Sequence, residues 1–357
     1  MAASLLVVDL SDYERRKGDI AASLLTAAED CGFFYLTGHG IAEEDVADAF
    51  ALSRAFFAAP EDVRRATTGD VSNAHYVLGY SEEAQPEGTT RQGYLCAYDN
   101  SRMRSLWPSE QHLPGFKERA LRFMRQLDGV VVRVMACFAL ALGLQEDHFA
   151  RHMRVDDDDN GTALFFNHYP SVEGKAYKPD AMRIWAHTDF EVRMQPGISV
   201  QHAAHQLTER MQVLTLLFQS RPGLEVCPGK LAASAADALA AEKWRDVDPF
   251  PGAITCNLGD ALQYWTGGRL KSTFHRVRMP RPGEYTGERY SLAYFANAGL
   301  HTPLQDAARS APAVTFMQML EKRSQEVPLQ ADPATGQVVV TSLAGIAGGP
   351  DFAAQAA

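Results

Sequence analysis

The residues of this chain with the clearest capacity for chemistry are two histidines and an aspartate. His187 and Asp189 are separated by one residue, and His275 follows far downstream. Residues i and i+2 of a β-strand project from the same side, so His187 and Asp189 can hold one ion together. Two imidazoles and one carboxylate can cap a triangular face of an octahedral iron(II) ion and leave three positions open. The pattern therefore predicts a mononuclear iron site.

An arginine and a serine follow the second histidine at the same spacing. Arg289 and Ser291 are two residues apart, so a strand would place a guanidinium and a hydroxyl on one face. Together these groups can bind a carboxylate. A His-x-Asp motif alone is a weak signal. The order His-x-Asp, His, Arg-x-Ser is a stronger one, because it supplies both a metal site and an anion site.

The elements that must position these residues change in character along the chain. The N-terminal part predicts strands at residues 5–10 and 31–36 and helices at residues 20–31, 43–57 and 117–142. The last of these has the longest amphipathic pattern, with an apolar stripe along one side. We expect this helical N-terminal portion to cover one face of a sheet.

From about residue 162 the period changes to that of short strands. Strand-like runs lie at residues 164–166, 184–186, 214–218, 253–257, 262–265, 272–277 and 291–295. Gly267-Gly268 between two of them is a hairpin turn signal. A series of short strands separated by turns is typical of a sandwich or jelly roll. The sequence therefore predicts a mainly β fold with flanking helices.

Composition argues against several classes of binding partner and cellular location. The chain has 357 residues, 46% of them apolar, and a formal net charge of −10, which argues against nucleic acid or anionic membrane as a partner. Its five cysteines are scattered and lack Cys-x-x-Cys spacing, as is typical of a reducing compartment. The first nine residues show no secretory signal, and the most apolar run, 129–144, is too short to cross a membrane. We expect a cytoplasmic monomer that binds a small molecule.

Beyond these motifs, residues 5–325 resemble the isopenicillin N synthase-like branch of the iron(II)/2-oxoglutarate-dependent dioxygenases. In the N-terminal part the resemblance rests on residues 6–10, 32–36, 39–41, 56–60, 106–108 and 113–116. It is closest over residues 259–269, which begin Gly259-Asp260-Ala261-Leu262, and it runs on through Ser272 to His275-Arg276-Val277. An ordered match of this length is not expected by chance.

The resemblance implies a double-stranded β-helix, or jelly roll, with a helical N-terminal module. It implies Fe(II) at the open end of the core, bound by His187, Asp189 and His275. The reaction it implies consumes 2-oxoglutarate and O2, releases succinate and CO2, and hydroxylates a small-molecule metabolite, with desaturation or cyclisation as variants. Ascorbate is a candidate reductant.

The resemblance also implies a binding mode for the cosubstrate. 2-Oxoglutarate would chelate the iron while Arg289 and Ser291 hold its distal carboxylate. Asn167 and Tyr169 match positions that often contact the cosubstrate. The expected division of the chain is an N-terminal dioxygenase module at 1–115, a jelly-roll domain with its supporting helix at 116–325, and a partly disordered tail at 326–357, rich in Ala, Gly and Pro.

Two aspects of the function stay open at this point. Phe165, Phe190 and Phe295 are expected either to form the walls of the substrate pocket or simply to pack in the barrel core. An iron-dependent oxidase of the same fold that does not use 2-oxoglutarate is a rival function, as is a non-catalytic product or binding protein. The substrate is not specified by any motif.

One segment departs from the family pattern. Residues from Val192 to Gln212 match nothing in the family, and joining Glu191 directly to Val213 would restore its pattern. Because valine codons begin with GT and the glutamine codon CAG ends with AG, we favour a retained intron translated in frame. The alternative is a surface insertion that covers the active site, since loops near sites are often functional. If the segment is present in the protein, it must bulge out of the fold immediately beside a predicted metal ligand.

Several other polar groups are expected to be structural or solvated rather than metal ligands. His-x-x-His spacing alone and a run of aspartates without the glycine of a calcium loop are weak signals. A residue that follows a metal ligand is expected to support that ligand or to pack. We expect His148 with His152 and the run from Asp156 to Asp159 to be solvated, and His39 to be structural; the other groups are His202 with His205, and Arg276.

Overall fold

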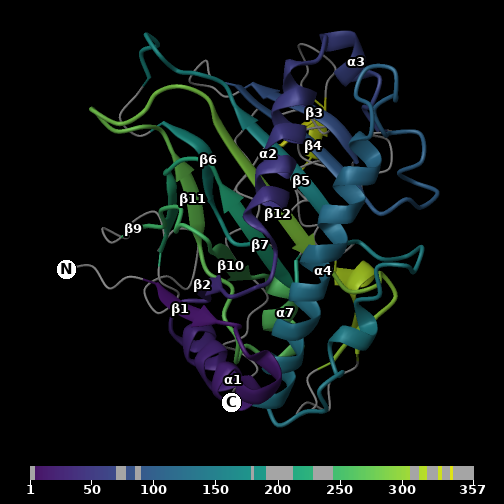
Figure 1. Cartoon of the computed structure of the whole chain (residues 1–357), viewed down its shortest axis with the longest axis vertical. Coiled ribbons are helices and arrows are strands. Elements are labelled where there is room, and N and C mark those ends of the chain that lie inside the picture. The colour runs from purple at the N-terminus through teal and green to yellow at the C-terminus, as the bar shows by residue number, and fades with distance from the viewer. Residues whose placement is uncertain are drawn as a thin grey trace.

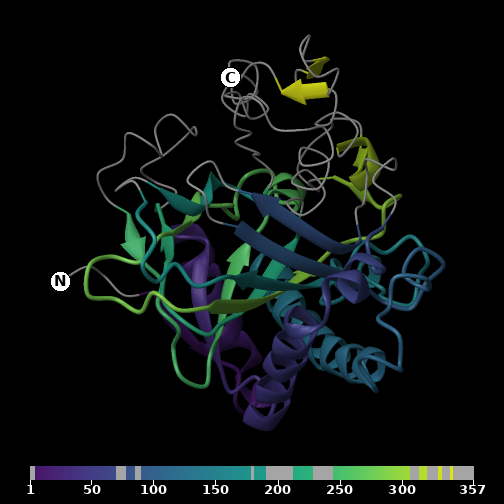
Figure 2. The same ribbon diagram turned by 90° about the horizontal axis from the view of Figure 1, so that it is seen from above.

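The computed structural model describes residues 5–69, 78–84, 90–177, 181–189, 212–227, 244–305, 313–319, 329–331 and 338–340. Two sheets of eight and four strands dominate this part of the chain. The long helices lie together on one side of the larger sheet, and the smaller sheet lies apart from them (Figures 1 and 2). Residues of both sheets line one shared cavity. The expected mainly β, jelly-roll class is confirmed.

The eight-stranded sheet is assembled from distant parts of the sequence. Its strand order is β1-β2-β10-β7-β12-β5-β4-β3, with β1 parallel to β2 and the other pairings antiparallel. The bounds are β1 Leu6–Asp9, β2 Phe33–Thr37, β3 Gly79–Ala84, β4 Thr90–Ala97, β5 Ala163–Tyr169, β7 Leu214–Gln219, β10 Ile254–Leu258 and β12 Arg289–Ala296. N-terminal strands therefore form both edges of the sheet.

The pairing of β12 with β5 decides which side chains face the cavity. Arg289 lies opposite Tyr169, and Ser291 lies opposite Asn167. Successive side chains of a strand point to opposite faces, so these residues share one face and line the cavity together. The alternate residues, such as Phe166, pack on the opposite face beneath the helices.

The four-stranded sheet carries the predicted histidines. Its order is β6-β11-β8-β9, with β6 Met182–His187, β8 Leu224–Val226, β9 Arg245–Asp246 and β11 His275–Arg278. His275 lies directly opposite His187 in the antiparallel pairing of β11 with β6. Register shifts follow further along this pair. The topology alone therefore brings the two imidazoles side by side.

The three predicted helices are present, although the first begins at Tyr13 rather than at residue 20, and the short helix at residues 61–65 was not predicted. The structure contains α1 Tyr13–Asp30, α2 Glu43–Ala58, α3 Glu61–Arg65, α4 Phe116–Ala141 and a 3-10 turn at Ala150–His152. The predicted apolar stripe of α4 is buried against α1, α2 and the large sheet, with Leu127, Val131 and Val134 in the main core. In the described part of the chain, no helix is both long and apolar enough to cross a membrane.

Two local predictions were wrong. Residues 262–265 are not a strand but part of helix α7, Asp260–Trp265, because a short apolar run does not distinguish the two structures. Gly267 and Gly268 have φ of 63° and 80° and end this helix rather than forming a hairpin, since the Gly268 N–H donates to the Gln263 carbonyl at 2.7 Å. Strands β3 and β4 were not predicted.

Four short strands complete the described chain. β13 at Pro303–Leu304 pairs with β14 at Val314–Thr315, and β15 at Leu329–Ala331 pairs with β16 at Val338–Val340. The rest of the predicted tail, 326–357, lies outside the described residues, so its expected disorder stays a prediction.

Candidate active site

The predicted metal ligands meet at the end of the smaller sheet. One donor atom each from His187, Asp189 and His275 lies within 4.8 Å of the other two, and all three residues are buried. The Nε2 atom of His275 is 3.4 Å from Oδ1 of Asp189. Strand β6 ends at His187, so Asp189 lies just beyond the strand that was expected to carry both residues. The described residues contain no other such cluster.

Backbone carbonyls fix the orientation of both imidazoles. His187 Nδ1 is 2.7 Å from the carbonyl oxygen of Trp185, and His275 Nδ1 is 3.0 Å from that of Thr273. A carbonyl can only accept, so each Nδ1 carries the proton and each Nε2 presents its lone pair. The edge-to-face contact of the Phe33 ring with His275, at 5.3 Å, holds the second ring further. Both histidines are therefore in the tautomer that binds a metal through Nε2.

Neutral side chains orient the carboxylate. Oδ2 of Asp189 accepts hydrogen bonds from Asn257 Nδ2 and, at 3.3 Å, from Thr215 Oγ1. Both donors bind the same oxygen, which directs Oδ1 toward His275. Sequence motifs did not identify Asn257 or Thr215. The available signal was a polar residue at alternate positions of strands β10 and β7, whose other residues are apolar.

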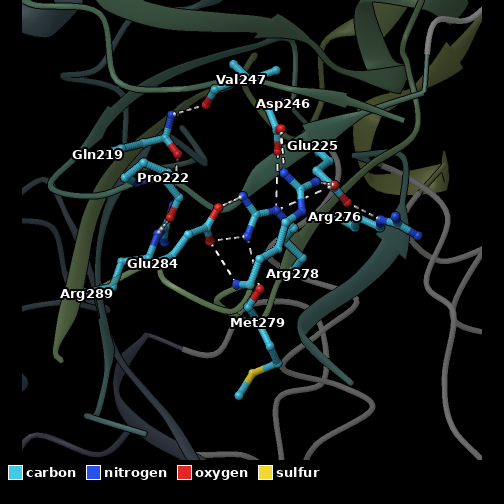
Figure 3. Close-up of polar contacts among 11 residues, drawn as sticks. Gln219, Pro222, Glu225, Asp246, Val247, Arg276, Arg278, Met279, Glu284 and Arg289 are labelled. Carbon is cyan, nitrogen blue, oxygen red and sulfur yellow. Dashed lines mark hydrogen bonds and ion pairs between the residues drawn. The ribbon is translucent and has the colours of Figure 1, made fainter. Parts of the chain in front are cut away.

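At the other end of the cavity, Arg289 is fully enclosed by protein. Its Nε donates to the carbonyls of Arg221 and Pro222 at 3.2 Å, and Nη2 donates to Gln219 Oε1 at 2.8 Å. Gln219 is held in turn by the carbonyl of Val247, at 3.2 Å (Figure 3). The guanidinium is thereby fixed in one orientation.

The remaining nitrogen of this guanidinium indicates an anion site. Nη1 of Arg289 is buried without a hydrogen-bond partner among the described residues. An unsatisfied buried donor of this kind costs about 1–3 kcal/mol, more when it is charged. Burial lowers the pKa of Arg289 from its usual value, with the hydroxyl group of Tyr169 acting in the opposite direction. A bound carboxylate would satisfy the donor and compensate the buried charge.

The residues around Arg289 complete this end of the cavity. Tyr169 lies with its ring centre 4.9 Å from the guanidinium carbon of Arg289 and 5.6 Å from that of Arg183. Burial and the charge of Arg289 lower the pKa of Arg183 to about 10. Ser291 and Asn167 line the same cavity, and Oδ1 of Asn167 is buried without a partner in the described part of the chain. All four predicted cosubstrate residues are thus brought to one place.

A group of ion pairs stabilises the four-stranded sheet that carries His275. Glu225 is buried and accepts from Arg276 at 2.6 Å and from Arg281 at 2.7 Å. Arg278 binds Glu284 through two contacts of 2.6 and 2.9 Å (Figure 3). Arg276 therefore points away from the metal ligands and supports the strand that carries His275. This agrees with its predicted supporting role.

Of the three phenylalanines that were expected either to line the pocket or to pack in the core, the structure describes two. Phe165 and Phe295 both line the cavity, with ring centres 6.2 Å apart. Phe190 lies outside the described residues. The two placed rings belong to adjacent strands, β5 and β12, on the face that also carries the cosubstrate residues.

The structure describes most of the other polar groups that the sequence singled out. His148 and His152, which were expected to be a solvated pair, are instead partly buried and pack against the Trp265 ring, at 6.4 and 5.7 Å. The Nδ1 atom of His39 accepts from the Ile41 N–H at 3.2 Å. The run from Asp156 to Asp159 lies in turns, with Asp156, Asp157 and Asp158 exposed, as expected of a solvated turn. His202 and His205 lie outside the described part of the chain.

The segment that departs from the family pattern lies between two residues of the candidate metal site, Asp189 and Thr215. Of the stretch from Val192 to Gln212, only Gln212 is described, and it is buried, with its carbonyl accepting from the Ala261 N–H at 3.3 Å. Beyond it, Thr215 reaches back to Asp189. The chain on the two sides of the segment is therefore close together in space, which both the intron and the insertion interpretation allow.

Comparisons with known proteins agree with this geometry. Residues 5–112 match the family described as "non-haem dioxygenase in morphine synthesis N-terminal", and residues 161–298 match the 2OG-Fe(II) oxygenase superfamily. The second match contains all seven predicted site residues: His187, Asp189, His275, Arg289, Ser291, Asn167 and Tyr169.

Individual relatives cover most of the chain. The proline hydroxylase buaE of Petromyces alliaceus is 29% identical over 80% of this chain and 83% of its own length. The 2-oxoglutarate-dependent dioxygenase ecdK of Aspergillus rugulosus is 27% identical over 80% of this chain and 83% of its own length. A full-length Neurospora crassa protein solved in complex with alpha-KG and thymine shares the fold, with a TM-score of 0.71, 23% identity and coverage of 90% of this chain and 96% of that one. This chain therefore belongs to the isopenicillin N synthase-like iron(II)/2-oxoglutarate-dependent dioxygenases, and it is an oxygenase that uses Fe(II), 2-oxoglutarate and O2.

Proposed function

We propose that His187, Asp189 and His275 hold the iron and that Arg289 and Ser291 bind the distal carboxylate of 2-oxoglutarate. The observation that carries this assignment is the shared cavity. It has three convergent metal donors at one end and, at the other, a buried guanidinium nitrogen without a partner among the described residues. The donor set suits iron(II), because two imidazoles and one carboxylate leave three positions for exogenous ligands.

Asn167 and Tyr169 are assigned to the same cosubstrate. Both lie on β5, opposite Ser291 and Arg289 in the register, and both line the same cavity. The amide of Asn167 can present its NH2 group to a cosubstrate oxygen if it is rotated about its last torsion. Tyr169 holds the Arg289 guanidinium against its ring and so limits the directions in which Nη1 can point.

The iron and 2-oxoglutarate supply the oxidative chemistry when bound, with succinate and CO2 as products and hydroxylation of a substrate C–H bond as the outcome. The protein's part is to position the reactants and to exclude water. Phe165, Phe295 and Val277 give the cavity apolar walls near the metal ligands. A proline hydroxylase among the relatives and thymine in the similar structure support a small, non-polymeric substrate. Desaturation and cyclisation are variants of the same chemistry.

We also propose that the enzyme acts as a cytoplasmic monomer without nucleic-acid or membrane partners. A net charge of −10 supports the absence of nucleic-acid binding. All five cysteines are buried as free thiols, which suits a reducing compartment.

The direct test is formation of succinate from 2-oxoglutarate by the purified protein over a panel of candidate metabolites. We expect turnover that requires both iron and 2-oxoglutarate and that is stimulated by the correct metabolite. Absence of succinate with every metabolite, together with absence of 2-oxoglutarate binding, would refute the proposal.

A further inference from the structure

A second buried arginine lies near Arg289 and has no part in the assignments above. Arg183 belongs to β6, the strand that ends at His187, and only 6% of its surface is exposed. Its Nη2 atom is buried without a hydrogen-bond partner among the described residues. A buried charged donor of this kind is costly, so Arg183 destabilises the fold unless an anion compensates its charge. Such a residue is a candidate for a role in binding.

The orientation of Arg183 arises from a bulge in its strand. Val277 and Arg278 are consecutive in β11, but they lie opposite Ile184 and Met182, which are two residues apart in β6. Arg183 is therefore the extra residue of a β-bulge, a feature that can redirect a side chain beside an active site. Ile184 lines the cavity, and a regular strand would turn its neighbour to the other side.

The ring of Tyr169 lies beside both buried arginines. Its centre is 4.9 Å from the guanidinium carbon of Arg289 and 5.6 Å from that of Arg183. Tyr169 belongs to β5 and lines the cavity, so this contact shows that Arg183 reaches from the smaller sheet to the cosubstrate end. Arg183 itself is not one of the residues that line the cavity. It can therefore act on a bound anion through Tyr169 and through its charge rather than by direct contact.

The charges around Arg183 favour an anion at this end of the cavity. Burial lowers the pKa of Arg183 to about 10, and the charge of Arg289 acts in the same direction. The other described groups that act on its charge are two tyrosines, Tyr169 and Tyr177, so no described carboxylate compensates Arg183. Coulombic attraction falls only with the inverse of distance, and buried charges are screened little by salt. A cation several ångströms from a bound carboxylate therefore still strengthens its binding.

We propose that Arg183 is a positioning residue for the cosubstrate and that it strengthens binding of the distal carboxylate of 2-oxoglutarate at Arg289. Its charge adds to the attraction for the carboxylate, and its contact with Tyr169 keeps that ring against the Arg289 guanidinium. This inference rests on the proposed function, because it takes Arg289 as the site of the distal carboxylate. It makes Arg183 a determinant of cosubstrate choice, favouring 2-oxo acids that carry a second carboxylate.

The test compares two probes that differ only in the distal group. 2-Oxopentanoate has the chain length and the chelating group of 2-oxoglutarate, with a methyl group in place of the distal carboxylate. Each is titrated anaerobically into the full-length enzyme loaded with Fe(II), and binding is followed by the metal-to-ligand charge-transfer band and by calorimetry. The ratio of the two dissociation constants measures the preference for the distal carboxylate. Arg183→Met and Arg183→Gln should each lower this preference about 10-fold, whereas Arg183→Lys keeps the charge and should lower it less than about threefold.

A merely structural role for Arg183 gives a different result. If the side chain only supports the fold, its neutral variants should weaken both probes by the same factor and leave the preference unchanged, which would overturn the inference. A preference lowered as much by Arg183→Lys as by Arg183→Met would also overturn it, since the charge would then have no part. Arg154→Gln changes an arginine whose side chain is 68% exposed and should keep the wild-type preference.

The same titrations separate this inference from the proposed function. Arg289→Gln should lower the preference about 100-fold. A wild type that binds the two probes equally would overturn the proposed function and this inference together. A wild type whose preference is lost in Arg289→Gln but fully kept in Arg183→Met and Arg183→Gln would overturn this inference alone.

Discussion

The metal end and the cosubstrate end of the cavity hold their key side chains by different means. At the metal end, His187 and His275 are oriented by backbone carbonyls, and Asp189 is oriented by neutral side chains. At the cosubstrate end, Arg289 is a buried cation, and one of its nitrogens has no partner among the described residues. The metal end is therefore organised before ligands bind. The cosubstrate end is fully satisfied only when an anion arrives, so changes at the two ends should have separable effects.

The largest effect is expected from removal of a metal ligand. His187→Ala leaves two donors and should abolish stoichiometric iron binding, with turnover reduced by on the order of 1000-fold or more. The measurement is iron content after anaerobic loading, alongside succinate formation. His112→Ala, which changes an exposed histidine, should leave both unchanged. A His187→Ala variant that retains one iron per chain would contradict the assignment.

The corresponding change at the cosubstrate end should leave iron binding unchanged. Arg289→Gln removes the buried charge that is expected to pair with the cosubstrate, and 2-oxoglutarate should bind about 100-fold more weakly. Iron binding should be unaffected, because no metal donor contacts this guanidinium in the described structure. Calorimetric titration of both ligands checks the separation. A loss of iron in this variant would show that the two ends are not independent.

A smaller change is expected when a residue that orients a ligand is removed. Asn257→Ala deletes a donor to Asp189 and should weaken iron binding about 10-fold to 100-fold. Thr215→Val should have a smaller effect, since its contact with the same oxygen is longer, at 3.3 Å. Competition with a chelator gives both affinities. If either variant weakened 2-oxoglutarate binding more than iron binding, the expected separation of effects between the two ends would be wrong.

A change outside both ends should alter stability alone. Burial, followed by the carboxylate of Asp156, raises the pKa of Asp128 on α4 from 3.8 to about 6. This group therefore contributes its full stability below pH 3.8, and the contribution is lost as the pH rises through about 6. Asp128→Asn should stabilise the fold at pH 7 by about 1 kcal/mol, after allowance for solvent screening, and by little at pH 4. Thermal unfolding at both pH values measures this, and an equal gain at both would contradict it.

The smallest effect is expected from deletion of residues 192–212. The side chains of Asp189 and Thr215 are in contact, so the chain on the two sides of the segment is close together, and we expect the predicted metal ligands to keep their places although the buried Gln212 is lost. The deletion variant should keep its affinity for iron and 2-oxoglutarate within about threefold. Sequencing of the spliced transcript separates the intron from a true insertion. A deletion variant without iron would show that the segment supports the site.

The sequence was sufficient for the residues that form ordered motifs and for the long helices. His-x-Asp, His and Arg-x-Ser predicted the set of side chains that the fold brings to one cavity, and the periodicity of α4 predicted its buried face. Sequence motifs did not assign Asn257 and Gln219 to the site, because their contacts arise from antiparallel pairing between strands far apart in the chain. Helix α7 was missed because six residues are too few to reveal a period.

The central claim is that one cavity binds iron at one end and that 2-oxoglutarate extends from the iron to Arg289 at the other. The most direct measurement is an anaerobic titration of the purified protein with Fe(II) and then with 2-oxoglutarate, followed by visible absorption. We expect one iron per chain and a saturable metal-to-ligand charge-transfer band on addition of 2-oxoglutarate, with no band in His187→Ala and a much weaker affinity in Arg289→Gln. Stoichiometric iron binding without any such band, and without calorimetric binding of 2-oxoglutarate, would contradict the claim.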